Sequence, residues 1–316
     1  FLSATAAFPA LRAAQAKRPP NIVFIMADDL GVGDLGCYGQ KKFATPNIDR
    51  LAAEGMRFTQ TYAGCTVCAP SRSVLMTGYH GGHTSVRGNG GGSPLAATDM
   101  TIAQLLQSAG YATGGFGKWG LGDLGSEGVP WKKGFDVFFG YLHQVHAHYY
   151  YPKHLVFNQH LSLLPGNGDA QRAIYSQDAI LEKALGFIEK SQEQPFFCYM
   201  PLTIPHLEYL VPEDSMKPFE GQFEEKPYID PRRHYADQPK PRAAYAGMVT
   251  RLDRDVGRVL DLLKKLKLDD NTVVFFTSDN GAATPLVGDD YFNSTAGLRG
   301  HKTNFYEGGI RTPMIA

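Results

Sequence analysis

Two pairs of oxygen-bearing residues stand where apolar runs of the sequence end. Asp28 and Asp29 form the first pair, and Asp279 and Asn280 form the second. Three carboxylates and an amide oxygen suit a hard cation, Ca²⁺ or Mg²⁺, better than Zn²⁺. Each pair by itself is also typical of a turn, so a cation site requires the two pairs to converge.

A cysteine followed by a helix-like stretch is the second chemical feature. In Cys65-Thr-Val-Cys68-Ala-Pro-Ser-Arg72 the cysteines have the spacing of a redox pair or of half a zinc site. The other two cysteines of the chain are single and offer no second pair of zinc ligands. Residues 71–77 favour a helix that ends before Gly78. Cys68 would then lie at a helix N-terminus, where free N–H groups and the helix dipole favour an anion.

The elements that must position these residues alternate along the chain. Continuous apolar runs predict buried strands at residues 21–27, 111–116, 195–202 and 272–278. Amphipathic spacing predicts helices at 47–54, 101–108, 178–190 and 243–266, with Asp99 as the cap of the second. This order indicates an α/β fold with a large mixed, mostly parallel sheet and helices on both faces. Ligands bind such sheets at the carboxyl ends of the strands.

Two segments interrupt the alternation. Residues 140–159 contain four histidines and four tyrosines, and we expect them to form a loop beside the site. Residues 208–241 are charged and broken by prolines, which predicts an excursion over the surface or a lid.

The composition excludes several classes of protein. Basic and acidic side chains number 31 each, so the chain has no electrostatic footprint for nucleic acid or an anionic membrane surface. No apolar run reaches the roughly 18 residues of a membrane span. Residues 1–16 are apolar and end in Ala14-Gln15-Ala16, which predicts the remnant of a secretory signal peptide and export to the periplasm or medium. A frayed N-terminal helix is the alternative interpretation of this segment.

Cys68-Ala-Pro-Ser-Arg72 resembles the signature of the sulfatase family, in which the cysteine is oxidised after translation to formylglycine. Other family motifs follow in the family's order, including Pro46-Asn-Ile-Asp-Arg-Leu, Gly117-Lys118-Trp119, Pro205-His206, Ser278-Asp279-Asn280-Gly281 and Tyr306-Glu-Gly-Gly309. The chain is similar to the arylsulfatase branch of the alkaline-phosphatase-like superfamily over residues 17–316. The resemblance implies a catalytic domain there, and a smaller C-terminal subdomain that is absent after Ala316.

The resemblance implies a nucleophile and a cation. Formylglycine made from Cys68 by a maturation enzyme would attack sulfur as its hydrate and displace an alcohol, and its second hydroxyl would then expel sulfate. Asp28, Asp29, Asp279 and Asn280 would hold one Ca²⁺, or Mg²⁺, which binds a sulfate oxygen and helps to deprotonate the hydrate.

The resemblance also implies roles for four cationic or titratable side chains. Arg72 and Lys118 would stabilise the alkoxide of the hydrate, and Lys302 would hold a sulfate oxygen. His206 would protonate the leaving oxygen.

One position departs from the family pattern. Family members commonly have histidine two residues after Lys118, whereas this chain has Gly120. His146 is the expected replacement, because it lies in the histidine-rich segment; that segment is otherwise a rim of the substrate pocket. His83 and Arg87 are expected at the same mouth.

The sequence supports a sulfuric ester hydrolase that acts on a sulfated sugar or an aryl sulfate. Two alternatives remain open. Relatives with the same nucleophile and metal hydrolyse phosphonates or phosphodiesters, and a non-catalytic relative would keep the fold and bind carbohydrate.

Overall fold

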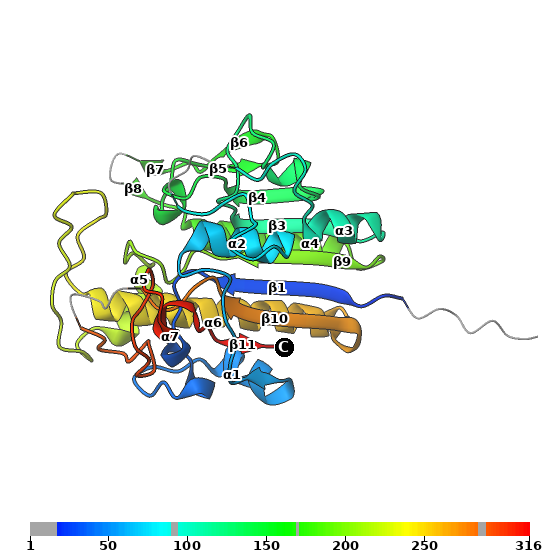
Figure 1. Ribbon diagram of the computed structural model, residues 1–316. Coiled ribbons are helices and arrows are strands. Elements are labelled where there is room, and N and C mark those ends of the chain that lie inside the picture. Colours follow the sequence, from blue (N-terminus) through cyan, green and yellow to red (C-terminus); the bar gives the residue numbers. More distant parts are fainter. Residues whose placement is uncertain (1–17, 90–93, 169–170, 284–288) are drawn as a thin grey trace, which may run out of the picture.

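A computed structural model describes residues 18–89, 94–168, 171–283 and 289–316. The signal remnant expected at residues 1–16 lies outside the described residues. Nine strands form one mixed sheet in the order β2-β11-β10-β1-β9-β3-β4-β5-β6 (Figure 1). The central strands are β10 (Thr272–Ser278), β1 (Asn21–Ala27), β9 (Phe196–Pro201), β3 (Ala112–Lys118) and β4 (Val137–Tyr141). The outer strands are β2 (Arg57–Phe58), β11 (Met314–Ile315), β5 (His154–Phe157) and β6 (His160–Leu163), and β7 (Asn167–Gly168) and β8 (Gln171–Arg172) form a separate hairpin.

The five central strands are parallel, and the outer strands add to them in antiparallel fashion. This confirms the mixed sheet and all four predicted strands. In the pairing of β1 with β10, Ala27 lies opposite Ser278. The aspartates that follow these two residues therefore emerge side by side at the carboxyl edge of the sheet.

Helices cover both faces of the sheet. In the view of Figure 1, α2 lies in front of β3 and α6 lies behind β10. The main helices are α1 (Pro46–Glu54), α2 (Cys68–Thr77), α3 (Ile102–Ser108), α4 (Ser176–Lys190) and α6 (Pro241–Lys265), with single turns at α5 (Glu213–Met216) and α7 (Glu307–Ile310). Turns of 3₁₀ helix occupy Val32–Asp34, Gly36–Tyr38, Pro130–Lys132, His146–His148, Lys217–Phe219 and Asp269–Asn271.

The alternating side chains of β1 divide between two cores, as a doubly covered strand requires. Val23 and Ile25 pack in a core that includes α4 and α6 residues. Met26 packs in the opposite core, which includes Ala69 and Met76 of α2. Across the part of the chain that the structure describes, no helix is both long enough and apolar enough to cross a membrane.

Two local expectations were wrong. Helix α3 is capped by Thr101, not Asp99: the Thr101 Oγ1 accepts a hydrogen bond from the Gln104 backbone N–H at 3.2 Å, and Asp99 accepts one from Ala96 instead. The segment 140–159 is not a loop throughout, and two of its tyrosines belong to the core. Tyr141 and Tyr150 are fully buried, and the segment contains the end of β4, a 3₁₀ turn and β5.

Asp253 of α6 holds the start of α1 by accepting hydrogen bonds from the Asn47 and Ile48 backbone N–H groups, at 2.9 and 2.8 Å, and from Asn47 Nδ2 at 2.8 Å. We expect Asp253→Ala to lower the free energy of unfolding by about 3 kcal/mol, because a buried charged acceptor and its hydrogen bonds are lost. Denaturant titration measures the change. Asp261 of the same helix pairs with Arg50 of α1 at the surface, so Asp261→Ala is the matched control and should cost less than about 1 kcal/mol. Equal losses of unfolding free energy in the two variants would contradict the role given to Asp253 at the start of α1.

Candidate active site

A backbone turn brings the paired aspartates together. Successive side chains of a strand point to opposite faces, so Asp28 and Asp29 could not converge if β1 simply continued. Asp29 has φ of 66°, in the left-handed region, which breaks the alternation. Its backbone N–H donates to Asp279 Oδ1 at 3.2 Å, and the Asp279 N–H donates to the Ala27 carbonyl at 3.1 Å. The ends of β1 and β10 are thus joined directly.

Cys68 is the first residue of α2, as the sequence indicated, although the helix begins at Cys68 and not at Ser71. The thiol is buried, and Sγ donates to Asp28 Oδ1 at 3.3 Å. Burial and the neighbouring Asp28 carboxylate raise the pKa of Cys68 to about 12. The unmodified thiol is therefore protonated at neutral pH and is a poor nucleophile.

Each carboxylate of the cluster faces a cation. Lys118 Nζ lies 2.6 Å from Asp28 Oδ2, and Lys302 Nζ lies 2.7 Å from Asp29 Oδ1. Arg72 donates to Asp279 Oδ2 from both Nε and Nη2, at 3.0 and 2.8 Å.

Burial alone would raise the pKa of Asp28. Lys118, Arg72 and Lys302 outweigh burial and hold this pKa well below its usual value. The carboxylate of Asp28 is therefore ionised across the neutral range, as a cation ligand must be.

The residues present fit a hard cation. Asn280 Nδ2 donates to Asp29 Oδ1 at 2.8 Å, whereas Asn280 Oδ1 is buried without a hydrogen-bond partner. A buried acceptor without a partner is costly, and a cation would satisfy it. Asp28, Asp29, Cys68 and His206 each offer one ligand atom, and these atoms lie within 4.8 Å of one another. Asp279, a predicted ligand, also uses its carboxylate to bind Arg72.

His206 lies against this cluster, with Nε2 at 3.4 Å from Asp29 Oδ2 and Nδ1 in contact with the Leu207 carbonyl. Burial and the nearby Lys302 lower its pKa well below the usual value. The ring of His148 stacks on His206, with centroids 3.9 Å apart and an angle of 18° between the rings. The Tyr235 hydroxyl, 2.9 Å from His148 Nδ1, holds this second imidazole in place.

The structure brings His148, and not His146, to the cluster. Both belong to one 3₁₀ turn, in which residues two apart point in different directions. The His146 ring packs against His154 and Tyr141, with centroids 4.8 and 5.1 Å away, and lines a separate cavity with Arg172 and Glu208. Among the described contacts of His146, none reaches Cys68. Of the two mouth residues expected, His83 packs against the tilted ring of His80, with centroids 4.4 Å apart, and Arg87 donates to the Thr84 carbonyl.

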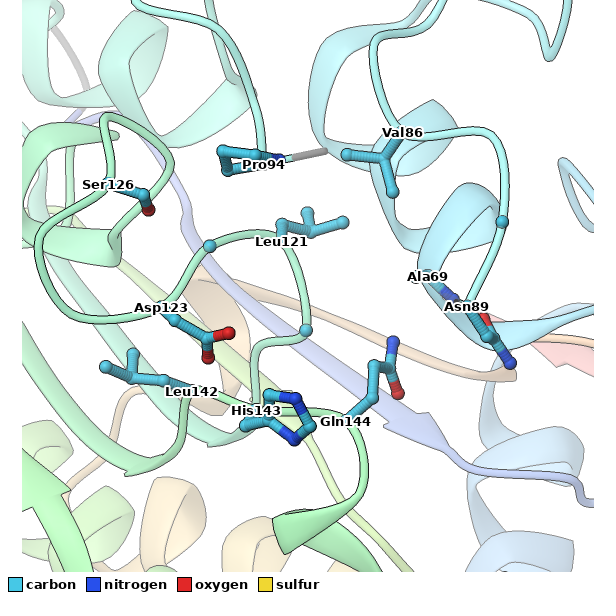
Figure 2. Close-up of a pocket in the computed structure, with 13 residues that line it drawn as sticks. Ala69, Val86, Asn89, Pro94, Leu121, Asp123, Ser126, Leu142, His143 and Gln144 are labelled. Carbon is cyan, nitrogen blue, oxygen red and sulfur yellow. Dashed lines mark hydrogen bonds between the residues drawn. The ribbon is translucent and has the colours of Figure 1, made fainter. Parts of the chain in front are cut away.

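Sequence reasoning also missed Gln144, which occupies the space above Gly120. Gly120 has φ of 74°, and a Cβ placed there would lie 2.4 Å from Gln144 Nε2. Figure 2 shows the Gln144 side chain extending into a cavity beside Ala69 and Asn89. The only signal in the sequence was the absent side chain at Gly120, which does not reveal what fills the space.

The five-stranded parallel centre, with its charged cluster at the carboxyl edge, defines an alkaline-phosphatase-like α/β fold. Residues 20–316 match the sequence profile of the sulfatase family. The chain therefore belongs to the sulfatase family.

Individual relatives agree with this assignment. The chain is 34% identical to N-acetylgalactosamine-6-sulfatase of Canis lupus familiaris, over 97% of this chain and 58% of the relative. It is 33% identical to arylsulfatase A of Homo sapiens, over 95% of this chain and 59% of the relative. The crystal structure of Ps i-CgsB in complex with k-i-k-neocarrahexaose superposes with a TM-score of 0.78 at 31% identity, covering 94% of this chain and 65% of that one. The chain thus spans a little over half the length of these curated relatives.

The ion pair of Arg72 with Asp279 is fully buried, which makes its loss measurable. We expect Asp279→Ala to lower the free energy of unfolding by about 3 kcal/mol, because the buried Arg72 guanidinium would keep only one carboxylate partner, Asp28, at 3.4 Å. Denaturant titration again provides the measurement. The double variant Arg72→Met/Asp279→Leu should recover part of the loss, since it leaves no unpaired buried charge at these two positions. An Asp279→Ala variant as stable as the parent would show that the pair does not hold the site together.

Proposed function

We propose that the protein hydrolyses the sulfate ester of a saccharide, with formylglycine made from Cys68 as the nucleophile and one divalent cation, Ca²⁺ or Mg²⁺. The observation that carries the proposal is the position of Cys68: it begins a buried helix, contacts Asp28, and is surrounded by the cations of the cluster. The family and the names of the relatives, which are sulfatases of sugars and aryl esters, support the reaction type. Export and conversion of Cys68 by a maturation enzyme belong to the same proposal.

The charge balance of the cluster suits an anionic substrate. Three carboxylates are matched by the cations Arg72, Lys118 and Lys302, so a bound divalent ion leaves the cluster positive by the ion's full charge. Bound there, the ion would supply Lewis-acid polarisation of a sulfate oxygen. Lys302 is the least buried of the three cations, with 14% of its side chain exposed, and is the one best placed to bind a sulfate oxygen.

The remaining cations act on residue 68. Lys118 and Lys302 both act to lower the pKa of the side chain at residue 68. They therefore stabilise a negative charge on that side chain. Arg72 donates through Nη1 to the Lys118 carbonyl at 2.6 Å, which fixes the end of β3 against α2. A hydroxyl of formylglycine at this place is held for attack on sulfur without any movement of the backbone.

His206 is the proton donor in this proposal. Its lowered pKa keeps the imidazole neutral in the free protein. A bound sulfate anion adds negative charge beside the ring and raises this pKa, so that His206 takes up a proton with the substrate and passes it to the leaving oxygen. Activity on a poor leaving group should accordingly fall as the pH rises through the pKa of the complex.

The central experiment compares two esters of one leaving group. In protein produced with a formylglycine-generating enzyme, mass spectrometry should find an aldehyde at residue 68 and an intact thiol at Cys65. Turnover of 4-nitrophenyl sulfate should scale with the converted fraction, and its kcat/KM should exceed that of bis(4-nitrophenyl) phosphate by at least about tenfold. A faster diester would favour a phosphodiesterase, and saccharide binding by fully converted protein without turnover would favour a non-catalytic relative. Active protein with both thiols intact would refute the nucleophile.

The cation is tested without reference to activity. Ca²⁺ should raise the melting temperature of the parent protein, since the ion binds only the folded state. The shift should be much smaller in Asp279→Ala, which lacks one predicted ligand. A parent protein whose melting temperature responds to neither Ca²⁺ nor Mg²⁺ would contradict the cation assignment.

Replacing His206 with Gln should depend on the leaving group. A general acid contributes about 10²–10⁴-fold when the leaving group is basic, so kcat on a sugar sulfate should fall by about a hundredfold or more. On 4-nitrophenyl sulfate, whose leaving group needs no proton, the fall should be below about tenfold. His154→Gln, in the separate cavity, is the matched control. Equal losses on both esters would show that His206 does not deliver the proton.

A further inference from the structure

A cavity of about 140 Å³ has no residue of the charged cluster in its lining (Figure 2). Its walls include residues that follow Cys68 and Lys118 of the cluster closely in the chain, and one that follows the neighbouring strand β4. Ala69 follows Cys68 in α2, Gly120 follows the end of β3 by two residues, and Leu142 follows the end of β4. The Gly120 backbone N–H donates to the Leu142 carbonyl at 3.0 Å, which continues the pairing of the two strands to the cavity.

Two polar groups in the cavity wall, the Gln144 amide and the Ser126 hydroxyl, are buried and have no hydrogen-bond partner among the described residues. Gln144 is 7% exposed, and neither its Nε2 nor its Oε1 makes a hydrogen bond. The hydroxyl of Ser126 is likewise buried and unpaired. A buried polar group left without a partner costs about 1–3 kcal/mol, and native structures rarely tolerate it without a functional reason.

The backbone at Gly120 makes room for Gln144. Any side chain at position 120 would begin 2.4 Å from Gln144 Nε2 and 2.8 Å from its Cδ, which is closer than atoms can pack. The inward position of the Gln144 amide therefore depends on glycine at position 120. On the far wall, Asn89 Oδ1 accepts a hydrogen bond from the Ala69 N–H at 2.9 Å, which ties the cavity to the first turn of α2.

The charge of this wall differs from that of the cluster. Among the described residues that line the cavity there is no lysine or arginine, and the one carboxylate is that of Asp123. An amide and a hydroxyl both donate and accept hydrogen bonds, so they match neutral hydroxyl or acetamido groups. A second anion would find no lysine or arginine among the described lining residues, where His143 is the one basic side chain, and would be repelled by Asp123.

We propose that this cavity binds the uncharged sugar ring that bears the reacting sulfate, with Gln144 and Ser126 hydrogen-bonded to neutral substituents of the ring. A cavity of about 150 Å³ accepts benzene, and a hexose is larger, so this cavity takes part of one sugar ring. The inference rests on the proposed sulfatase function and deepens it: the site distinguishes a monosulfated ring from one that carries a second anion. Gln144 is a specificity-determining residue in this assignment.

The test uses Gln144→Leu, which keeps the volume and removes both polar atoms, and Gln194→Leu at an exposed glutamine as control. The probes are galactose 6-sulfate, galactose 2,6-disulfate and 4-nitrophenyl sulfate, which lacks ring hydroxyls. In the parent protein kcat/KM should be higher for the monosulfate than for the disulfate. Gln144→Leu should lower kcat/KM on galactose 6-sulfate by at least about tenfold, mainly through KM, since a polar site discriminates strongly once its partner is lost. The loss on 4-nitrophenyl sulfate should be several times smaller.

Binding and stability separate this inference from the proposed function. Calorimetry with unconverted protein, in which Cys68 is a thiol, should show that galactose 6-sulfate binds the parent and Gln194→Leu more tightly than Gln144→Leu. The melting temperature of Gln144→Leu should equal or exceed that of the parent, because no hydrogen bond within the protein is lost. If binding responds in this way but no sulfate is turned over, the subsite stands and the proposed function fails. If sulfate is turned over and Gln144→Leu changes neither binding nor KM for galactose 6-sulfate, the subsite is wrong.

Discussion

Three carboxylates meet away from water at the ends of two adjacent strands, and this concentration of negative charge governs the arrangement around it. Buried carboxylates are tolerated only when cations or hydrogen-bond donors face them. The cations come from three separate elements: Arg72 from α2, Lys118 from β3, and Lys302 from the segment after β10. The ion pairs therefore hold α2, β3 and the segment after β10 against the carboxylates at the ends of β1 and β10. A divalent ion at the unpartnered Asn280 Oδ1 would add net positive charge to this balanced cluster.

The sequence predicted those features that follow from a single element. The runs that became β1 and β10 kept their predicted bounds, because strands buried on both faces are continuously apolar. Their adjacency then brought Asp28 and Asp279 together. Features that depend on the orientation of one turn could not be predicted from the sequence. His146 and His148 are chemically the same in the sequence, and only the position of the 3₁₀ turn decides which imidazole stacks on His206. The short outer strands were missed for a related reason, since two residues carry no periodic pattern.

The end of β3 separates two chemical environments. Lys118 points into the charged cluster, and two residues later Gly120 opens the cavity that Gln144 enters, whose described lining has no lysine or arginine. A sulfate ester has the same division, with an anion at one end and an alcohol at the other. Because Lys118 and Gly120 are two residues apart at the end of β3, the backbone fixes the distance between the charged cluster and the cavity. In the proposed function this rigidity orients the S–O bond without a lid that has to close.

In the proposed function, the stacked pair of His148 and His206 links proton supply to substrate binding. Two imidazolium rings 3.9 Å apart would repel each other, and each pKa is lowered by burial and further by the other charged groups nearby. The free protein therefore keeps both rings neutral, which avoids adding positive charge to a cluster that already holds three cations. In the proposed function, an arriving sulfate raises the pKa of His206, because the anion favours the protonated ring. Protonation of the leaving oxygen then follows from substrate binding.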